Sequence, residues 1–250
     1  MTNEFAKVNA SAKRPIDIWT NYLYYNISVR FVYLIRNTRI SPNEVTLSAL
    51  FMALIGCVGF ANGSRPWVLV GLVFAQISYV LDCADGQLAR YRQQFSPIGG
   101  WLDQVSDRIK EFAVYFSLAY GYTRQHPGDT RIWVWAMIGL FTLYLLEYYG
   151  QIGKQYFTPG TNPFNNGANT DDGGVGPDDE AHHAGFQKLQ FWRSFIPFRG
   201  FIIGEQYFAM LVFILFNAIY PFFVFVAVVG ILMSVYRPAI LFYKLRRGLA

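Results

Sequence analysis

Long apolar runs are the feature that most restricts how this chain can fold. Lipid offers the backbone no hydrogen-bond partners, so a chain crosses a bilayer as helices of about 20 mainly apolar residues or as a closed barrel of shorter strands. The runs here are too long for barrel strands. They predict an all-α integral membrane protein with six transmembrane helices, at roughly 43–62, 67–92, 99–122, 131–153, 198–220 and 221–245.

Composition agrees with this prediction. Charged residues make up only 15% of the chain and apolar residues 53%, whereas charged residues approach about a quarter of a soluble domain. These values exclude an ordinary water-soluble enzyme. They also exclude a disordered chain, because 18% of the residues are aromatic.

The residues before the first run indicate a helix at the membrane surface. Pro15 to Arg36 mixes aromatic and aliphatic side chains with arginines, which is the composition of an amphipathic helix lying in the interface. Ser41, Pro42 and Glu44 then form a helix start, with an N-cap serine, a proline at the first helical position and a glutamate at the third.

The distribution of positive charge predicts the orientation. Six spans put both termini on one side of the membrane, and the opposite side receives only three of the 21 Lys and Arg residues: Arg65, Arg124 and Arg131. By the positive-inside rule, both termini are predicted to be cytosolic, so the net charge of +5 reflects membrane topology and not nucleic-acid binding. The chain then divides into a cytosolic segment with the interfacial helix at 1–40 and a six-helix domain at 41–250, with a mobile cytosolic loop at about 154–197.

Four aspartates flank one predicted cytosolic turn. At about 100° per residue, one face of the second predicted helix carries a single group of residues: Asp82, Asp85, Gly86, Ala89 and Arg90. One face of the third carries another: Gly99, Asp103 and Asp107. Because the turn at 93–98 makes the two helices antiparallel, we expect all four carboxylates to converge.

Four carboxylates in a poorly solvated site repel one another unless a cation neutralises them. Oxygen ligands with no His or Cys nearby favour a hard ion, Mg²⁺ or Mn²⁺, and two such ions would balance four carboxylates. Gly86 and Ala89 leave room for a ligand on the same face, and Arg90 offers a guanidinium fork suited to phosphate. Together these residues indicate phosphoryl chemistry.

The spacing of these residues resembles that of a known family. Asp82-x-x-Asp85-Gly86-x-x-Ala89-Arg90, followed after eight residues by Gly99-x-x-x-Asp103-x-x-x-Asp107, matches the signature of the CDP-alcohol phosphotransferases at every position. The chain is also similar to this family in its six expected helices, its interfacial helix and a Pro-Asn-x-x-Thr start to the first span, formed by Pro42, Asn43 and Thr46.

The resemblance implies transfer of a substituted phosphate group from a CDP-linked donor to an acceptor hydroxyl, with release of CMP, in phospholipid synthesis. It implies that two divalent cations bind at Asp82, Asp85, Asp103 and Asp107. It also implies that Asp107 is the base that deprotonates the acceptor. It also implies that the CDP site consists of six residues: Gly86, Ala89, Arg90, Gly99, Asn43 and Thr46. Members of the family are homodimers, so a homodimer in the lipid bilayer is expected, with its active site open to the cytosol.

The resemblance leaves the substrates open. CDP-diacylglycerol is the favoured donor, with a small polar acceptor such as inositol phosphate, glycerol phosphate or serine; the Asp107-Arg108 pair resembles branches that use inositol-type acceptors. The alternative is a soluble CDP-alcohol donor of the CDP-choline, CDP-ethanolamine or CDP-inositol type. Arg193 and Arg199 could hold an acceptor phosphate or could simply satisfy the positive-inside rule.

Three other interpretations of the aspartates compete with catalysis. They could be structural carboxylates paired with nearby cations: Arg90, Arg92, Arg108 and Lys110. They could line the pathway of a cation or proton transporter, although they gather at one membrane face and no broken helix pair marks a midplane site. They could belong to a sensor that binds a nucleotide without turning it over, which the presence of Asp107 argues against.

Overall fold

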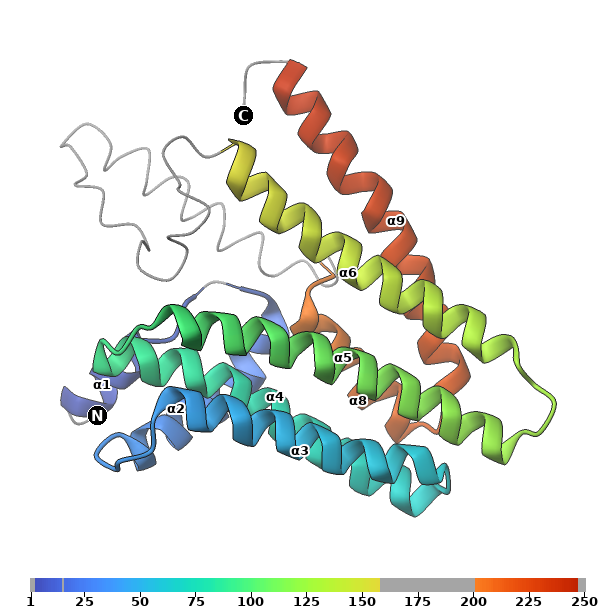
Figure 1. Ribbon diagram of the computed structural model, residues 1–250, viewed down its shortest axis with the longest axis horizontal. Helices are drawn as coiled ribbons and strands as arrows, with labels where there is room; N and C mark the ends of the chain where they lie inside the picture. Colours follow the sequence, from blue (N-terminus) through green and yellow to red (C-terminus); the bar gives the residue numbers. More distant parts are fainter. Residues whose placement is uncertain (1–2, 15, 158–200, 247–250) are drawn as a thin grey trace.

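A computed structural model of the chain describes residues 3–14, 16–157 and 201–246, and every regular element in these ranges is a helix. Three long helices, α3 (Pro42–Asn62), α4 (Arg65–Arg92) and α5 (Pro97–Gln125), lie side by side (Figure 1). A second pair, α6 (Arg131–Phe157) and α9 (Ile219–Arg246), diverges from them. The shorter α8 (Ile203–Leu215) packs against α4 and α9.

Four of these helices are long and apolar enough to cross a membrane: Pro42–Asn62, Arg65–Arg92, Arg131–Ile152 and Ile219–Tyr243. They coincide with four of the predicted spans, and the chain is an integral membrane protein. The prediction of six spans is not established by the described residues. Helix α5 has 29 residues but carries several charged side chains in its first half, and α8 has 13, which gives a length of about 20 Å against a hydrocarbon core of about 30 Å.

The boundary between the last two predicted spans was misplaced. The structure ends α8 at Leu215 and begins α9 at Ile219, whereas the sequence suggested a break between 220 and 221. Asn217 adopts a left-handed conformation with φ of 57°, which asparagine tolerates better than most residues. The Ala218 N–H then donates to the Phe213 carbonyl at 2.8 Å, and this bond closes the end of α8.

Helix α3 begins as predicted. The Glu44 N–H donates to the Ser41 hydroxyl at 3.3 Å, and the Ser41 N–H donates to the Glu44 carboxylate at 2.6 Å, which completes a capping box. Gly63 ends the helix with φ of 79°, a conformation that favours glycine.

Glycines bring α3 and α4 into close contact. A Cβ atom placed on Gly71 would lie 2.6 Å from the Gly56 carbonyl oxygen, and one on Gly56 would lie 2.8 Å from the Gly71 carbonyl oxygen. Any side chain at these two positions would therefore separate the helix backbones. Because α3 also packs along α5, it fixes the positions of the two helices that carry the aspartates.

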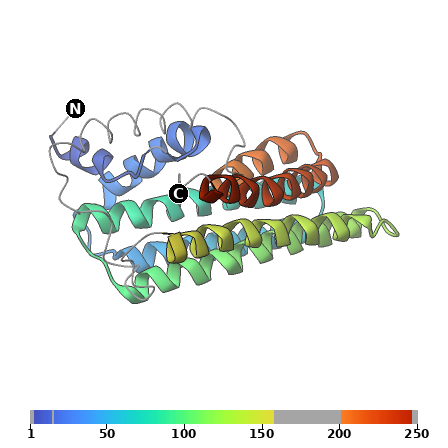
Figure 2. The same ribbon diagram turned by 90° about the horizontal axis from the view of Figure 1, so that it is seen from above.

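The N-terminal segment differs from the single helix predicted for Pro15 to Arg36. It consists of α1 (Asn3–Ala10), a π-helical turn η1 (Thr20–Tyr24) and α2 (Tyr25–Ile35), and α1 was not predicted. The Asp17 carboxylate accepts hydrogen bonds from the backbone N–H groups of Trp19 and Thr20, both at 2.9 Å. These bonds stabilise the start of η1. Both α1 and α2 lie on one side of α4 (Figure 2). Exposed apolar side chains on α2, such as Ile27 and Leu34, agree with an interfacial position, which remains a prediction.

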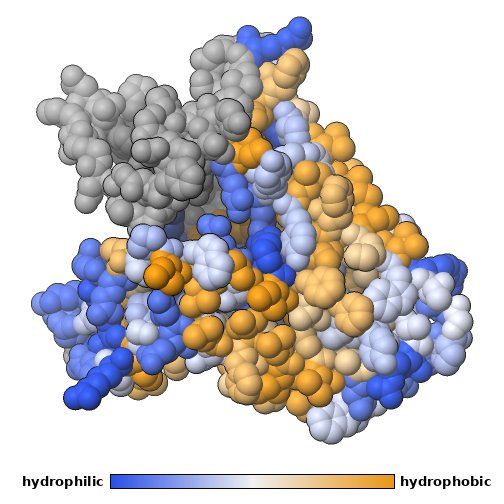
Figure 3. Space-filling model, viewed as in Figure 1, coloured by the Kyte–Doolittle hydropathy of each residue, from blue (hydrophilic) through white to orange (hydrophobic). Residues whose placement is uncertain are grey.

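The ends of the helices are distributed as a membrane protein requires. The turn after α3 and the loop between α5 and α6 lie at one end of the molecule, and α1 lies at the other (Figure 1). The space-filling view shows a broad apolar area between these ends and hydrophilic residues at both of them (Figure 3). This arrangement agrees with the predicted alternation of loops across the bilayer.

Candidate active site

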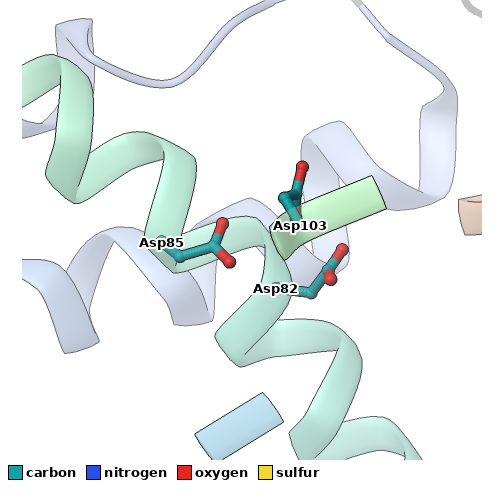
Figure 4. Close-up of side chains that lie close together, drawn as sticks. All are labelled: Asp82, Asp85 and Asp103. Carbon is teal, nitrogen blue, oxygen red and sulfur yellow. The ribbon is translucent and has the colours of Figure 1, made fainter. Parts of the chain in front are cut away.

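Three of the four predicted aspartates converge. Asp82 and Asp85 extend from α4 toward Asp103 on α5 (Figure 4), and one carboxylate oxygen of each lies within 4.8 Å of the other two. Among the described residues, Asp85 and Asp103 have no ion-pair partner. Two of the three clustered carboxylates therefore have no protein cation beside them. Such a cluster fits a hard divalent cation, as the sequence predicted.

Asp85 is the most firmly held member of this cluster. It is 6% exposed. Its carboxylate accepts hydrogen bonds from the Thr46 hydroxyl at 2.6 Å and from the Gly86 backbone N–H at 2.5 Å. Thr46 lies on α3, so its hydroxyl connects the start of that helix to the cluster. The sequence grouped Thr46 with the CDP site, and the structure places it between that site and the carboxylates.

Asp107 is not a member of the converging group. Its carboxylate lies 2.8 Å from the Lys110 ammonium, which also forms an ion pair with Asp82. Lys110 is 2% exposed, although it carries a full charge. The predicted convergence of four carboxylates is therefore found for three, and the fourth contacts a buried cation.

A cavity of about 200 Å³ adjoins the cluster where α4 ends and α5 begins. Asp85 and Asp103 form one side of it. All six residues that the resemblance assigned to CDP line this cavity: Asn43, Thr46, Gly86, Ala89, Arg90 and Gly99. The Ser96 hydroxyl accepts the Gly99 N–H at 2.9 Å and so caps α5 at the cavity.

The lack of a side chain at Gly99 leaves space open in the cavity. A Cβ atom on this residue would lie 2.8 Å from the Asn43 side-chain oxygen and 2.9 Å from the Ser96 hydroxyl. A side chain at Gly99 would therefore occupy space between α5 and the start of α3. At Gly100, by contrast, an added Cβ would meet no atom within 4 Å.

Arg90 is positioned by the N-terminal segment. Its Nε donates to the Ser11 carbonyl at 2.6 Å, while its terminal nitrogens lie beside Gly86 at the cavity. Helix α1 is itself held on α4, because the Tyr91 hydroxyl donates to Glu4 at 2.9 Å. Hydrogen bonds from Lys7 and Tyr91 keep the pKa of Glu4 below its usual range.

A second charged group connects α5 to α6 next to Asp107. Arg108 forms ion pairs with Glu111, at 2.9 Å, and with Glu147 on α6. Its guanidinium also lies over the Tyr144 ring, and the Tyr144 hydroxyl donates to the Arg108 carbonyl at 3.0 Å. Arg108 is therefore engaged between helices and does not pair with the predicted metal ligands.

The sequence named Lys110 only as one of four possible ion-pair partners of the aspartates, and it missed the contact between Ser11 and Arg90. Lys110 had a detectable signal, because Asp103, Asp107 and Lys110 are spaced i, i+4, i+7 and so share one helix face. No sequence signal indicated the contact between Ser11 and Arg90, because it joins segments far apart in the chain. Arg193 and Arg199, the possible acceptor-phosphate residues, lie outside the described residues, as do His182 and His183, to which the sequence assigned no role.

Known proteins resemble the part of the chain that builds this site. Residues 39–157 match the model of the family described as CDP-alcohol phosphatidyltransferase. The chain is 32% identical to the archaetidylinositol phosphate synthase of Pyrococcus horikoshii over 82 residues, which cover 33% of this chain and 42% of that protein. It is 35% identical to the CDP-diacylglycerol–inositol 3-phosphatidyltransferase of Drosophila melanogaster over 83 residues, which cover 33% of this chain and 35% of that protein.

A third relative matches over a longer stretch. The chain is 29% identical to a bifunctional IPC transferase and DIPP synthase of Thermococcus kodakarensis over 124 residues, which are 50% of this chain and 26% of that protein. The chain therefore spans less than half the length of each of these relatives. Residues 39–157, which match the family model, contain the aspartates and the residues that line the cavity.

Proposed function

We propose, from the match of residues 39–157 to the CDP-alcohol phosphatidyltransferase family, that the protein transfers a substituted phosphate group from a CDP-linked donor to the hydroxyl of a small polar acceptor, with release of CMP. The observation that carries the proposal is the convergence of Asp82, Asp85 and Asp103 beside a cavity that all six predicted CDP-binding residues line. Phospholipid synthesis is the setting.

The reaction exchanges one phosphorus–oxygen bond for another. The acceptor oxygen forms a bond to the phosphorus that bears the donor's alcohol, and the bond from that phosphorus to the bridging oxygen of the diphosphate breaks. CMP leaves with the bridging oxygen. Asp107, one helical turn from Asp103, takes the proton of the attacking hydroxyl, and Arg90, which lines the cavity, contacts the diphosphate.

Two divalent cations, Mg²⁺ or Mn²⁺, complete the site in this proposal. When bound, they would neutralise the diphosphate and stabilise the entering and leaving oxygens. Asp82, Asp85 and Asp103 would hold them, and Asp107 lies near enough to contribute when it is free of Lys110. Thr46 keeps the Asp85 carboxylate in a fixed orientation for this role.

CDP-diacylglycerol is the favoured donor. An apolar groove of about 600 Å³ runs between α2, α4 and α8, with Ile27, Leu72 and Leu211 among its lining residues. The groove extends along α4 to Leu81, one helical turn from Asp85, so a lipid whose diphosphate is in the cavity could place an acyl chain there. A soluble CDP-alcohol, such as CDP-choline, CDP-ethanolamine or CDP-inositol, would not need this groove.

An inositol-type acceptor is favoured over glycerol phosphate or serine. The names of two relatives contain inositol, the archaetidylinositol phosphate synthase and the CDP-diacylglycerol–inositol 3-phosphatidyltransferase. The acceptor would enter from the cytosolic side, where the predicted orientation places the cavity. A homodimer is part of the proposal by resemblance to the family.

Release of CMP tests the proposal directly. Purified protein in detergent is supplied with Mg²⁺ or Mn²⁺, and CDP-diacylglycerol and soluble CDP-alcohols are each combined with inositol phosphate, inositol, glycerol phosphate and serine. We expect turnover with CDP-diacylglycerol and an inositol-type acceptor, loss of turnover on chelation, and weaker binding of both metal and CDP in Asp82→Asn. No CMP from any pair, together with cation flux in sealed vesicles without nucleotide, would instead support a transporter.

A further inference from the structure

Lys110 is a buried cation inside the group of carboxylates that the proposed function assigns to metal. It is 2% exposed, and its ammonium contacts Asp82 and Asp107. A charged amine is costly to remove from water unless carboxylates compensate it, and Asp82 and Asp107 provide this compensation. Neither carboxylate is then fully available to a metal ion.

The four aspartates therefore divide into two groups. Asp82, Asp85 and Asp103 each have one carboxylate oxygen within 4.8 Å of the other two, whereas Asp107 contacts only Lys110 among charged side chains of the described residues. Three carboxylates within 4.8 Å can surround one divalent cation. The position between Asp82 and Asp107, where a second cation would neutralise the remaining charge, holds the Lys110 ammonium.

We propose that Lys110 is a positioning residue that takes the place of one of the two divalent cations in the nucleotide-free protein. Four carboxylates and one ammonium carry three negative charges, and a single divalent cation reduces this to one. Without Lys110 the same carboxylates would need two divalent cations for neutrality. The site is thus expected to bind one metal ion tightly by itself, and a second only when a diphosphate adds negative charge.

The inference rests on the proposed function for the metal site, and it deepens that proposal. Lys110 would hold Asp107 in place until the donor arrives, so the second cation and the base would become available together. Because Lys110 acts through Asp82 and Asp107, its removal should alter metal stoichiometry in the absence of any substrate. That readout is independent of turnover.

The test counts Mn²⁺ ions bound per chain without nucleotide, by titrating detergent-solubilised protein and measuring free Mn²⁺ by electron paramagnetic resonance. We expect one tight ion in the wild type and two in Lys110→Met, with the second bound at least about tenfold more tightly than in the wild type. Arg108→Met is the matched control. It removes a positive charge two residues away, from a side chain paired with Glu111 and Glu147, and should leave one tight ion.

The outcomes separate this inference from the proposed function. Two tight ions in the wild type, or an unchanged count in a folded Lys110→Met variant, would overturn the role of Lys110 while CMP release could still occur. No Mn²⁺ site sensitive to Asp82→Asn would overturn the metal site of the proposed function as well. If Lys110→Met fails to fold, the number of Mn²⁺ ions bound tightly by the wild type still tests the inference. Lys110→Gln then supplies a second neutral side chain at this position.

Discussion

Asp103 and Asp107 lie one turn apart on α5, yet they have different surroundings. Asp103 joins the carboxylate cluster, whereas Asp107 contacts the Lys110 ammonium at 2.8 Å. The difference agrees with different roles, one as a metal ligand and the other as the proton acceptor. At the scale of single residues, the proposal can therefore be tested by changes that separate binding from chemistry.

Asp107→Asn should abolish turnover but retain CDP binding. The amide has the shape of the carboxylate and can still accept a hydrogen bond from Lys110, but it cannot take a proton from the acceptor, so we expect a loss of about 100-fold or more in CMP release. Calorimetric titration with CDP and Mn²⁺ measures the binding. Asp129→Asn, the same change in the loop between α5 and α6, should leave both quantities unchanged. Full turnover in Asp107→Asn would remove this residue from the mechanism.

Gly99→Ala should weaken CDP binding. The added Cβ would lie 2.8 Å from the Asn43 side-chain oxygen, so α5 or the start of α3 must shift at the cavity. We expect about a tenfold increase in the dissociation constant for CDP, equivalent to about 1.4 kcal/mol. Gly150→Ala is the control, because its Cβ meets nothing within 4 Å and Gly150 does not line the cavity. Equal affinities in the two variants would mean that CDP does not use this wall of the cavity.

At the scale of helices, the contact between α3 and α4 supports the site. Thr46 of α3 donates to Asp85 of α4, and further along the same two helices the backbones approach closely at Gly56 and Gly71. A change far from the aspartates that separates these helices should therefore affect both stability and the site.

Gly71→Ala should lower the melting temperature in detergent. Its Cβ would lie 2.6 Å from the Gly56 carbonyl oxygen, and overpacking of this kind costs about 1–3 kcal/mol, which corresponds to a shift of several degrees. Gly150→Ala on α6 places its Cβ in open space and should have no such effect, since alanine favours helices. A melting temperature equal to that of the wild type would show that the close approach adds little stability.

At the scale of the whole molecule, the proposed topology decides where substrates arrive. Three helices, α3, α4 and α5, lie between the N-terminal segment and the loop before α6. If all three cross the membrane, positions 3 and 126 lie on opposite sides, with position 3 in the cytosol.

Cysteine labelling tests this topology. In a background with Cys57 and Cys83 replaced by alanine, we expect a membrane-impermeant maleimide to label His126→Cys in intact cells and to label Asn3→Cys only after the membrane is opened. Labelling of neither position in intact cells would mean that α5 does not cross. Labelling of position 3 alone would reverse the orientation and place the cavity outside the cytosol.

The sequence by itself determined those features whose physical cause is local. The apolar runs of α3, α4, α6 and α9 must form helices if they lie in lipid, and Ser41 with Glu44 specified where α3 begins. The spacing of Asp82, Asp85 and Asp103 placed them on facing helix surfaces, because helix periodicity and a short turn suffice for that. The cavity residues followed from the same periodicity and from the resemblance to a family.

Only the tertiary structure decided which charges become partners. Lys110 and Arg108 were both near enough in sequence to pair with the aspartates, but the packing of the helices places Lys110 beside Asp82 and Arg108 beside Glu147. The Ser11 carbonyl could be placed beside Arg90 only by the docking of α1. Such contacts depend on how separate helices pack, and the periodicity of one helix carries no information about the side chains of its neighbours.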